Sequence, residues 1–240
     1  MARRNMMPPS PADQAKVDLE FTAQRAPSPD LWEAAYLRFE TPDQEVQKFV
    51  GRLLKLGAAA WPRDAEIVEL FCGRGNGLQA LHRLGFSRIQ GLDLSPRLIA
   101  QYHGPAICIV ADCRQLPFEA RSKDLLIVQG GLHHLPALPQ DLQQTFSEMQ
   151  RVLRKNGRVV FVEPWLTPFL RLVHLASENP LARRVSNKLE ALATMILLER
   201  PTYQQWLTHP RLITRLARSH FSPVHESFAW GKWNFVGTPR

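Results

Sequence analysis

The chain has 240 residues, 45% of them hydrophobic, and a formal net charge of +8 at pH 7. That length suits one doubly wound domain with a single large core, and no apolar run is long enough to span a bilayer. The three cysteines show neither a paired framework nor the spacing of metal ligands, so we expect free thiols, no bound metal and a cytoplasmic location.

The first part of the chain predicts a tail followed by a helix. Residues 1–29 hold five prolines and no sustained apolar periodicity, which is typical of a flexible tail. Residues 31–36 include two large aromatic side chains, and this segment either folds over a ligand or packs in the core. A capping-box pattern at Thr41 then predicts a helix that begins at Pro42 and is ended by Gly57.

A buried strand is predicted over residues 67–71, followed by a turn with three alternating glycines. The strand is rich in branched apolar residues, as strands buried on both faces are. Glycine permits positive φ angles and lacks a β-carbon, so the backbone at Gly73, Gly75 and Gly77 can approach a ligand closely. The helix that we expect to begin at about Asn76 adds unpaired N–H groups at its start.

A second predicted strand ends in Asp93, 20 positions beyond Gly73, where a carboxylate can accept both hydroxyls of a ribose. Nicotinamide dinucleotides and S-adenosylmethionine both fit that arrangement. Counted from Gly73, the last glycine of a dinucleotide fingerprint falls at Leu78, so this register fails. A count from Gly75 ends at Ala80, which some variants allow, and it leaves the dinucleotide open.

Three further segments complete the pattern. Apolar strands are predicted within residues 106–113, 123–129 and 153–164, with a turn at Asn156 and Gly157 in the last of these segments. In this order, from about Glu66 to Pro164, the set resembles the class I S-adenosylmethionine-dependent methyltransferases, in particular their small-molecule branch of the methyltransferase type 11 kind. The resemblance is specific for cofactor and fold, and it says little about the substrate.

The resemblance implies an α/β fold with a doubly wound, Rossmann-like sheet of seven strands, mostly parallel, that ends in an antiparallel C-terminal hairpin. Helices would cover both faces, and a helical cap would follow the fifth strand. Residues 30–240 would form one methyltransferase domain with a helical insertion at about 165–202. Ligands of such sheets gather at the carboxyl ends of the strands, so residues just after each strand are the site candidates.

For the methionine and ribose part of the cofactor, the resemblance implies contacts with the glycine turn. Gly73, Gly75 and Gly77 would wrap this part, with Glu69 nearby, and Gln129 would lie near the methionine end. The chain departs from the family just before the first glycine, where small residues are more usual. We expect this departure to affect packing rather than the identity of the cofactor.

For the nucleoside part, the resemblance implies contacts at the ends of the next two strands. Asp93 would hold the ribose hydroxyls, and Leu94 would pack on the adenine. Asp112, together with the backbone of Cys113, would recognise the edge of the adenine ring.

A histidine pair follows the fourth strand and is expected to lie over the transferred methyl group. An imidazole can take a proton at neutral pH, so His133 and His134 are the candidates for a general base. A structural or substrate-orienting role for the two side chains is an equal alternative. Glu163 is a weaker candidate for the base, since its carboxylate is also placed to hold the loop after its strand.

After the fifth strand, helices are expected over about 168–179, 186–199 and 203–220. The first two either form a lid above the active site or complete the core, since an apolar stripe fits both. Short strands near 224–228 and 233–236 are expected to finish the sheet as an antiparallel hairpin.

The leading hypothesis is an S-adenosylmethionine-dependent methyltransferase that acts at O, N or C of a small, aromatic or lipid-like molecule. The aromatic residues of the C-terminal part motivate this acceptor class. They are Trp165, Phe169, Trp206, Trp230 and Trp233.

Three alternatives stay open. Residues 165–240 hold 10 Lys and Arg against 4 Asp and Glu, a surplus of +6 that suits a solvated surface, a nucleic acid or a peripheral contact with an anionic membrane. The first alternative is therefore a nucleic-acid methyltransferase. The second is a non-catalytic regulatory subunit that retains the cofactor pocket, and the third is a dinucleotide-dependent oxidoreductase.

Overall fold

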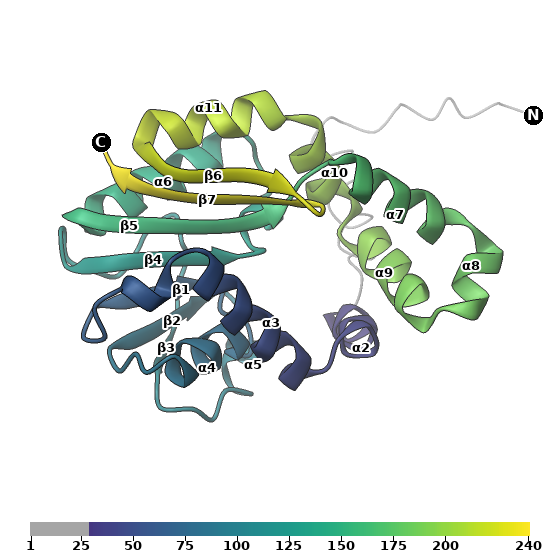
Figure 1. Cartoon of the computed structure of the whole chain (residues 1–240), viewed down its shortest axis with the longest axis horizontal. Helices are drawn as coiled ribbons and strands as arrows, with labels where there is room; N and C mark the ends of the chain where they lie inside the picture. The colour runs from purple at the N-terminus through teal and green to yellow at the C-terminus, as the bar shows by residue number, and fades with distance from the viewer. Residues whose placement is uncertain (1–28) are drawn as a thin grey trace, which may run out of the picture.

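Seven strands form one sheet in the order β3-β2-β1-β4-β5-β7-β6 in the computed structural model, which describes residues 29–240 (Figure 1). Strands β1 to β5 are parallel, and β7 pairs antiparallel with both β5 and β6. The predicted fold class is therefore confirmed. The strands are β1 Ile67–Leu70, β2 Ile89–Asp93, β3 Ile107–Val110, β4 Lys123–Gln129, β5 Leu153–Pro164, β6 Phe221–Ala229 and β7 Lys232–Pro239.

Helices of one group pack on the two faces of the sheet. They are α3 Pro42–Lys55, α4 Asn76–Arg83, α5 Pro96–Ile99, α6 Gln140–Val152 and α11 Pro210–His220. Two short 3₁₀ segments, η1 Ala58–Ala60 and η2 Leu132–His134, lie in connections. The capping box of α3 forms as expected: the Thr41 hydroxyl accepts a hydrogen bond from the Gln44 N–H, and the Gln44 side chain accepts one from the Thr41 N–H.

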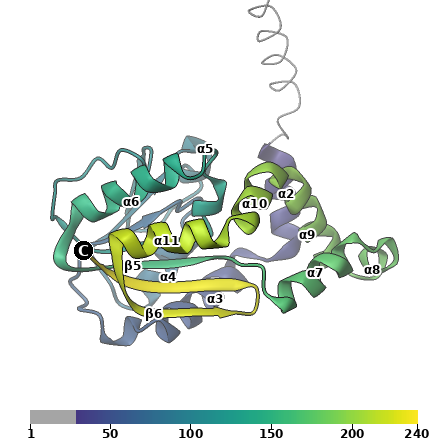
Figure 2. The ribbon, with the colours of Figure 1, turned by 90° about the horizontal axis from the view of Figure 1, so that it is seen from above.

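A second group of helices extends beyond the carboxyl ends of the parallel strands (Figures 1 and 2). It comprises α2 Pro29–Phe39, α7 Pro168–Glu178, α8 Pro180–Val185, α9 Asn187–Leu198 and α10 Arg200–Thr208. Helix α2 packs against α9, although the two are far apart in the sequence. The predicted tail, residues 1–29, lies outside the described residues except for Pro29, which begins α2.

The central strands divide the core into two apolar layers because alternate side chains point to opposite faces. One layer contains Val68, Val128 and Phe161 and is covered by α6 and α11. The other contains Ile67 and Ile127 and is covered by α3 and α4. Within the described part of the chain, every helix is too short or too polar to reach across a lipid bilayer.

The structure corrects two details of the predicted elements. Residues 156 and 157 were expected to form a turn, but β5 begins at Leu153 and continues through them with a shift in register opposite β4. The helix expected over about 203–220 is instead two helices, α10 and α11. Pro210 begins the second because proline fixes its own φ and cannot donate the N–H that a continuous helix requires.

Phe161 lies at the centre of an aromatic cluster on the α6 and α11 face. Its ring centroid is 5.3 Å from that of Phe146, 5.6 Å from Phe235 and 5.9 Å from Phe221. Its side chain is fully buried. This residue therefore joins the middle of the sheet to α6 and to the C-terminal hairpin.

We predict that Phe161→Ala lowers the free energy of unfolding by about 3–5 kcal/mol, because it removes a buried ring and leaves a cavity between the sheet and α6. Leu172→Ala on α7, where the side chain is 65% exposed, should change it by less than about 0.5 kcal/mol. Urea unfolding of both variants measures the difference. Equal unfolding midpoints for the two variants would contradict the central role of Phe161.

Candidate functional site

A cavity of about 570 Å³ lies at the carboxyl ends of the parallel strands, beneath α2 and α9. Its lining includes every predicted site residue except Gly75: Glu69, Gly73, Gly77, Asp93, Leu94, Asp112, Cys113, Gln129, His133 and His134. The topology thus brings together side chains that are spread over four strands and their connections. A volume of this size is typical of sites for cofactors and small molecules.

The glycine turn after β1 has the positive φ angles that its sequence predicts. Gly73 and Gly75 have φ angles of +51° and +81°, in the left-handed region that other residues rarely adopt. Gly75 faces the protein rather than the cavity, since a β-carbon there would lie 2.2 Å from the Tyr102 ring. At Gly77 an added β-carbon would lie 1.9 Å from Oε1 of Glu69, so this glycine leaves room for the carboxylate.

Glu69 is a buried acid with one oxygen unsatisfied. The Gln129 side-chain amide donates to Oε1 at 3.1 Å, while Oε2 has no hydrogen-bond partner within the described residues. Burial raises the pKa of Glu69 to about 8. Because Glu69 also lines the cavity, a ligand that brings a hydrogen-bond donor or a positive charge there would satisfy this orphaned oxygen.

Asp93 fixes the glycine turn from the neighbouring strand. Its Oδ2 accepts a hydrogen bond from the Gly73 N–H and its Oδ1 accepts one from the Ser95 N–H, both at 2.8 Å. Each oxygen keeps a further acceptor site, so the carboxylate can still accept hydroxyl groups from a ligand. Leu94, beside it, is 61% exposed and lies in the cavity wall.

Asp112 and Cys113 lie at the end of the cavity near β3. The Arg114 guanidinium bonds Asp112 at 2.7 Å and Asp141 at 2.9 Å, and it holds the pKa of Asp112 below its usual range. Cys113 is buried, with its thiol 3.6 Å from the hydroxyl of Thr145. The sequence predicted the position of Asp112 but not its pairing with an arginine.

Glu163 holds the loop that carries the histidine pair. It is completely buried, and its Oε1 accepts hydrogen bonds from the Gly131 and Leu132 N–H groups at 2.9 Å. Its Oε2 lies 2.8 Å from Nδ1 of His133. The loop-holding role considered for this carboxylate in the sequence is therefore observed.

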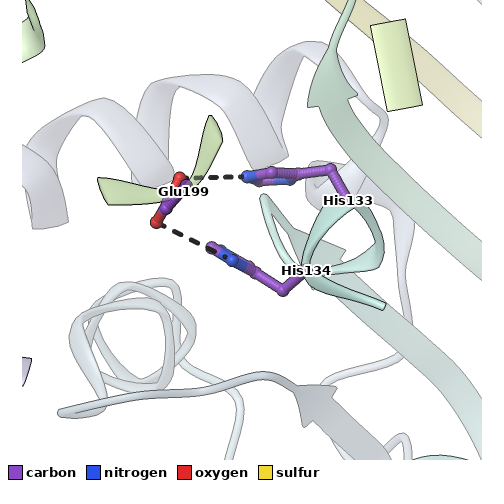
Figure 3. A group of neighbouring side chains, drawn as sticks. All are labelled: His133, His134 and Glu199. Atoms are coloured by element: carbon purple, nitrogen blue, oxygen red, sulfur yellow. Dashed lines mark ion pairs between the residues drawn. The ribbon is translucent and has the colours of Figure 1, made fainter. Parts of the chain in front are cut away.

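His133 and His134 both face Glu199, which follows α9 (Figure 3). The two rings are 4.2 Å apart at their centroids, and the shortest distances from their nitrogens to Glu199 oxygens are 3.8 and 3.7 Å. Burial acts to lower the pKa of His133, but its interactions with Glu163 and Glu199 outweigh burial and raise the pKa. Desolvation, followed by the charge of His133, lowers the pKa of His134, although its side chain stays 37% exposed.

Sequence reasoning missed a polar group that joins α2, α3 and α4. The Glu45 carboxylate accepts a hydrogen bond from the Tyr36 hydroxyl and another, at 2.5 Å, from the Asn76 amide. Arg52 donates to Oε1 of Gln129 at 3.3 Å. Glu45 and Arg52 share a helix face with the buried Phe49, since they stand four positions before it and three after it. Charged residues on a buried face were the signal in the sequence that could have revealed this group.

We predict that Glu69 makes the stability of the protein fall as the pH rises from about 5 to about 8. The folded-state pKa is about 8, whereas a solvated glutamate in the unfolded chain has a pKa of about 4.5, so unfolding releases a proton in this range and the unfolded state binds fewer protons. Glu69→Gln removes this titration. The thermal midpoint of the Glu69→Gln variant, relative to that of the unaltered chain, should therefore rise with pH. The corresponding change in relative free energy of unfolding is a few kcal/mol. Parallel curves for the two proteins would contradict the raised pKa.

Comparison with known proteins connects this fold and cavity to one family. The family model described as "Methyltransferase domain" (Methyltransf_11) matches residues 68–161, from β1 into β5. No curated protein sequence matches the chain. Among solved structures, the PH0226 protein of Pyrococcus horikoshii superposes with a TM-score of 0.61 at 19% identity, covering 85% of this chain and 96% of that one.

Two further solved structures are similar over nearly the whole chain. A TehB-like S-adenosylmethionine-dependent methyltransferase from Corynebacterium glutamicum has a TM-score of 0.53 at 16% identity, with 96% of this chain and 100% of that one covered. The 1,6-didemethyltoxoflavin-N1-methyltransferase of Burkholderia thailandensis, solved with its substrate and S-adenosylhomocysteine, has a TM-score of 0.53 at 17% identity, with 98% and 92% covered. Residues 68–161 therefore match a methyltransferase domain, within a chain whose overall fold is that of these solved structures.

Proposed function

We propose that the chain is an S-adenosylmethionine-dependent methyltransferase that acts on a small, largely apolar molecule lying under α2 and α9, between the glycine turn and the histidine pair. The observation that carries the proposal is the cavity itself, which continues from the glycine turn to a wall of aromatic and aliphatic side chains. Those side chains are Trp32, Tyr36, Phe39, Phe71, Leu135 and Met195. Such surroundings favour an aromatic or lipid-like acceptor, because apolar contacts supply most of the binding energy in sites of this kind.

At the methionine end of the cofactor, we assign contacts to Glu69, Gln129 and the glycine turn. The unpaired oxygen of Glu69 supports this assignment, because the cofactor carries positive charge on its ammonium and sulfonium groups. At the nucleoside end, Asp93 is assigned to the ribose hydroxyls, and Leu94, Asp112 and Cys113 to the adenine. The acceptor capacity left on Asp93 after its two backbone hydrogen bonds supports the first of these contacts.

Bound S-adenosylmethionine supplies a methyl carbon that is already activated by its sulfonium, so the chain chiefly has to align the acceptor. Alignment alone corresponds to an effective concentration of about 10⁵–10⁸ M. We assign His133 and His134 to the acceptor side of the cavity, where they orient its nucleophilic atom. The general-base role for either histidine stays a prediction.

We propose that α7, α8 and α9 form a lid rather than a part of the sheet core. No residue of these three fully described helices belongs to the two apolar layers of the sheet. Trp206 and Ile213, which follow on α10 and α11, do belong to one of the layers. This division supports the helical insertion predicted at about 165–202, with α2 packed against it.

The lining of the cavity argues against the nucleic-acid alternative. Five Lys and Arg residues line it, against seven Asp and Glu residues. The phosphate backbone of a nucleic acid binds where basic side chains predominate, and they do not predominate in the lining of this cavity. The basic surplus of residues 165–240 is therefore assigned to the surface outside the cavity.

The test is an acceptor screen in which the chain is incubated with S-adenosylmethionine and formation of S-adenosylhomocysteine is measured. We expect turnover with apolar aromatic or lipid-like molecules and none with RNA or DNA. Methylation of nucleic acid alone would overturn the acceptor class. Tight binding of S-adenosylhomocysteine without turnover on any acceptor would favour the regulatory subunit instead.

We predict that Gly77→Ala weakens binding of S-adenosylhomocysteine at least about tenfold, because the new β-carbon displaces the Glu69 carboxylate from its assigned contact. Calorimetric titration with the nucleoside measures the change. Gly51→Ala on α3 is the matched control, since nothing lies within 4 Å of the added β-carbon. The control should bind normally and gain about 0.5–1 kcal/mol in stability, as expected for alanine in a helix. Unaltered binding by Gly77→Ala would remove the glycine turn from the cofactor site.

A further inference from the structure

We propose that His133, His134 and Glu199 form a binding site for one divalent transition-metal ion of the zinc type, at the acceptor end of the cavity (Figure 3). The three side chains come from two parts of the fold: the histidines from η2 after β4, and the carboxylate from the junction of α9 and α10. All three line the cavity. The spacing of the cysteines led to the expectation of no bound metal; Glu199 is remote from the two histidines along the chain, so no spacing of metal ligands marks this cluster in the sequence.

The spacing of the ligand atoms fits a metal ion better than direct hydrogen bonds. One atom from each residue lies within 4.8 Å of the other two. Nε2 of His133 is 3.8 Å from one Glu199 oxygen, and Nδ1 of His134 is 3.7 Å from the other. Both distances exceed the usual limit of about 3.2 Å for an N–H···O bond. Around a tetrahedral ion with bonds of about 2.0–2.1 Å, neighbouring ligand atoms lie about 3.4 Å apart, so a set that lies within 4.8 Å has to close by at most about 1.4 Å.

Glu163 supplies the outer support that metal-binding histidines generally have. Its Oε2 is 2.8 Å from Nδ1 of His133, on the side of the ring opposite Glu199. If Nδ1 donates to this carboxylate, the lone pair on Nε2 is left directed at Glu199 and the cavity. Glu163 is itself immobilised by two backbone N–H groups. The buried Glu163 carboxylate therefore already orients the His133 ring so that its other nitrogen faces the cavity.

Three protein ligands beside a cavity leave a fourth position for a molecule from the cavity, as in catalytic rather than structural zinc sites. Resting on the proposed function, we assign this position to the nucleophilic atom of the acceptor. An acceptor hydroxyl bound there loses its proton to water more readily, since the ion stabilises the oxygen anion. The oxygen lone pair then forms the bond to the methyl carbon as the carbon–sulfur bond breaks, and S-adenosylhomocysteine leaves with the sulfur electron pair.

The test uses the full chain, stripped of metal with a chelator and titrated with Zn²⁺ by calorimetry. Co²⁺ serves as a spectroscopic probe, because a tetrahedral site of nitrogen and oxygen ligands gives strong visible bands without thiolate charge transfer. We expect one Zn²⁺ per chain. Glu199→Gln keeps the size of the side chain but is a poor ligand, and it should weaken binding by more than about 100-fold. Glu163→Gln should weaken it by the roughly 10- to 100-fold typical of outer-sphere changes.

His134→Ala gives a second measurement at a side chain that is 37% exposed, where loss of folding is not expected. The matched control is His225→Ala, an exposed histidine outside the cluster, and it should bind Zn²⁺ like the unaltered chain. Binding that survives both Glu199→Gln and His134→Ala would overturn the site, as would no binding at micromolar Zn²⁺. A cobalt spectrum with thiolate bands would place the ion at the cysteines and also overturn it.

Titration of the same samples with S-adenosylhomocysteine separates this inference from the proposed function. Nucleoside binding without Zn²⁺ binding would remove the metal site and leave the methyltransferase assignment untouched. Zn²⁺ binding with the expected losses in the variants, but without nucleoside binding, would support the site and contradict the proposed function.

Discussion

The site depends on one constraint, which is that parallel strands end at the same edge of their sheet. Each connection that leaves this edge exposes backbone N–H groups that need partners. Two carboxylates supply them: Asp93 holds the glycine turn, and Glu163 holds the loop after β4. The same two acids stand beside the parts of the cavity assigned to the ribose and to the acceptor. The side chains that support the two connections therefore also hold, or lie beside, the positions of the proposed ligand contacts.

The sheet, and the placement of the glycine turn and Asp93 at the cavity, could be predicted because both follow the order of the chain. Gly73 and Asp93 directly follow their strands, so finding the strand in the sequence locates the residue. The alternation of strands and helices likewise fixed the parallel arrangement and the position of the hairpin. Two local predictions were wrong. The turn expected at residues 156 and 157 lies within β5, where the pairing with β4 shifts in register, and Pro210 divides in two the helix that the apolar pattern predicted as continuous.

The side of the cavity that lies under α2 and α9 was not predictable in the same way. Tyr36, Glu45 and Glu199 meet in the cavity from segments whose relative positions depend on how α2 packs against α9. No spacing along the chain encodes that packing. Single residues can be noticed in the sequence, as the two histidines were, but their common partner Glu199 is identified only once the position of α9 is known.

Glu45 joins two parts of this molecule that have different tasks. Its carboxylate accepts one hydrogen bond from Tyr36 on α2 and another from Asn76, the first residue of the helix that follows the glycine turn. If α2 moves with the proposed lid when the cavity opens, the first hydrogen bond breaks and the second remains. Opening of the cavity would then change the contacts of the same carboxylate that holds the start of α4, so access to the cavity and the order of the glycine turn would be coupled through Glu45.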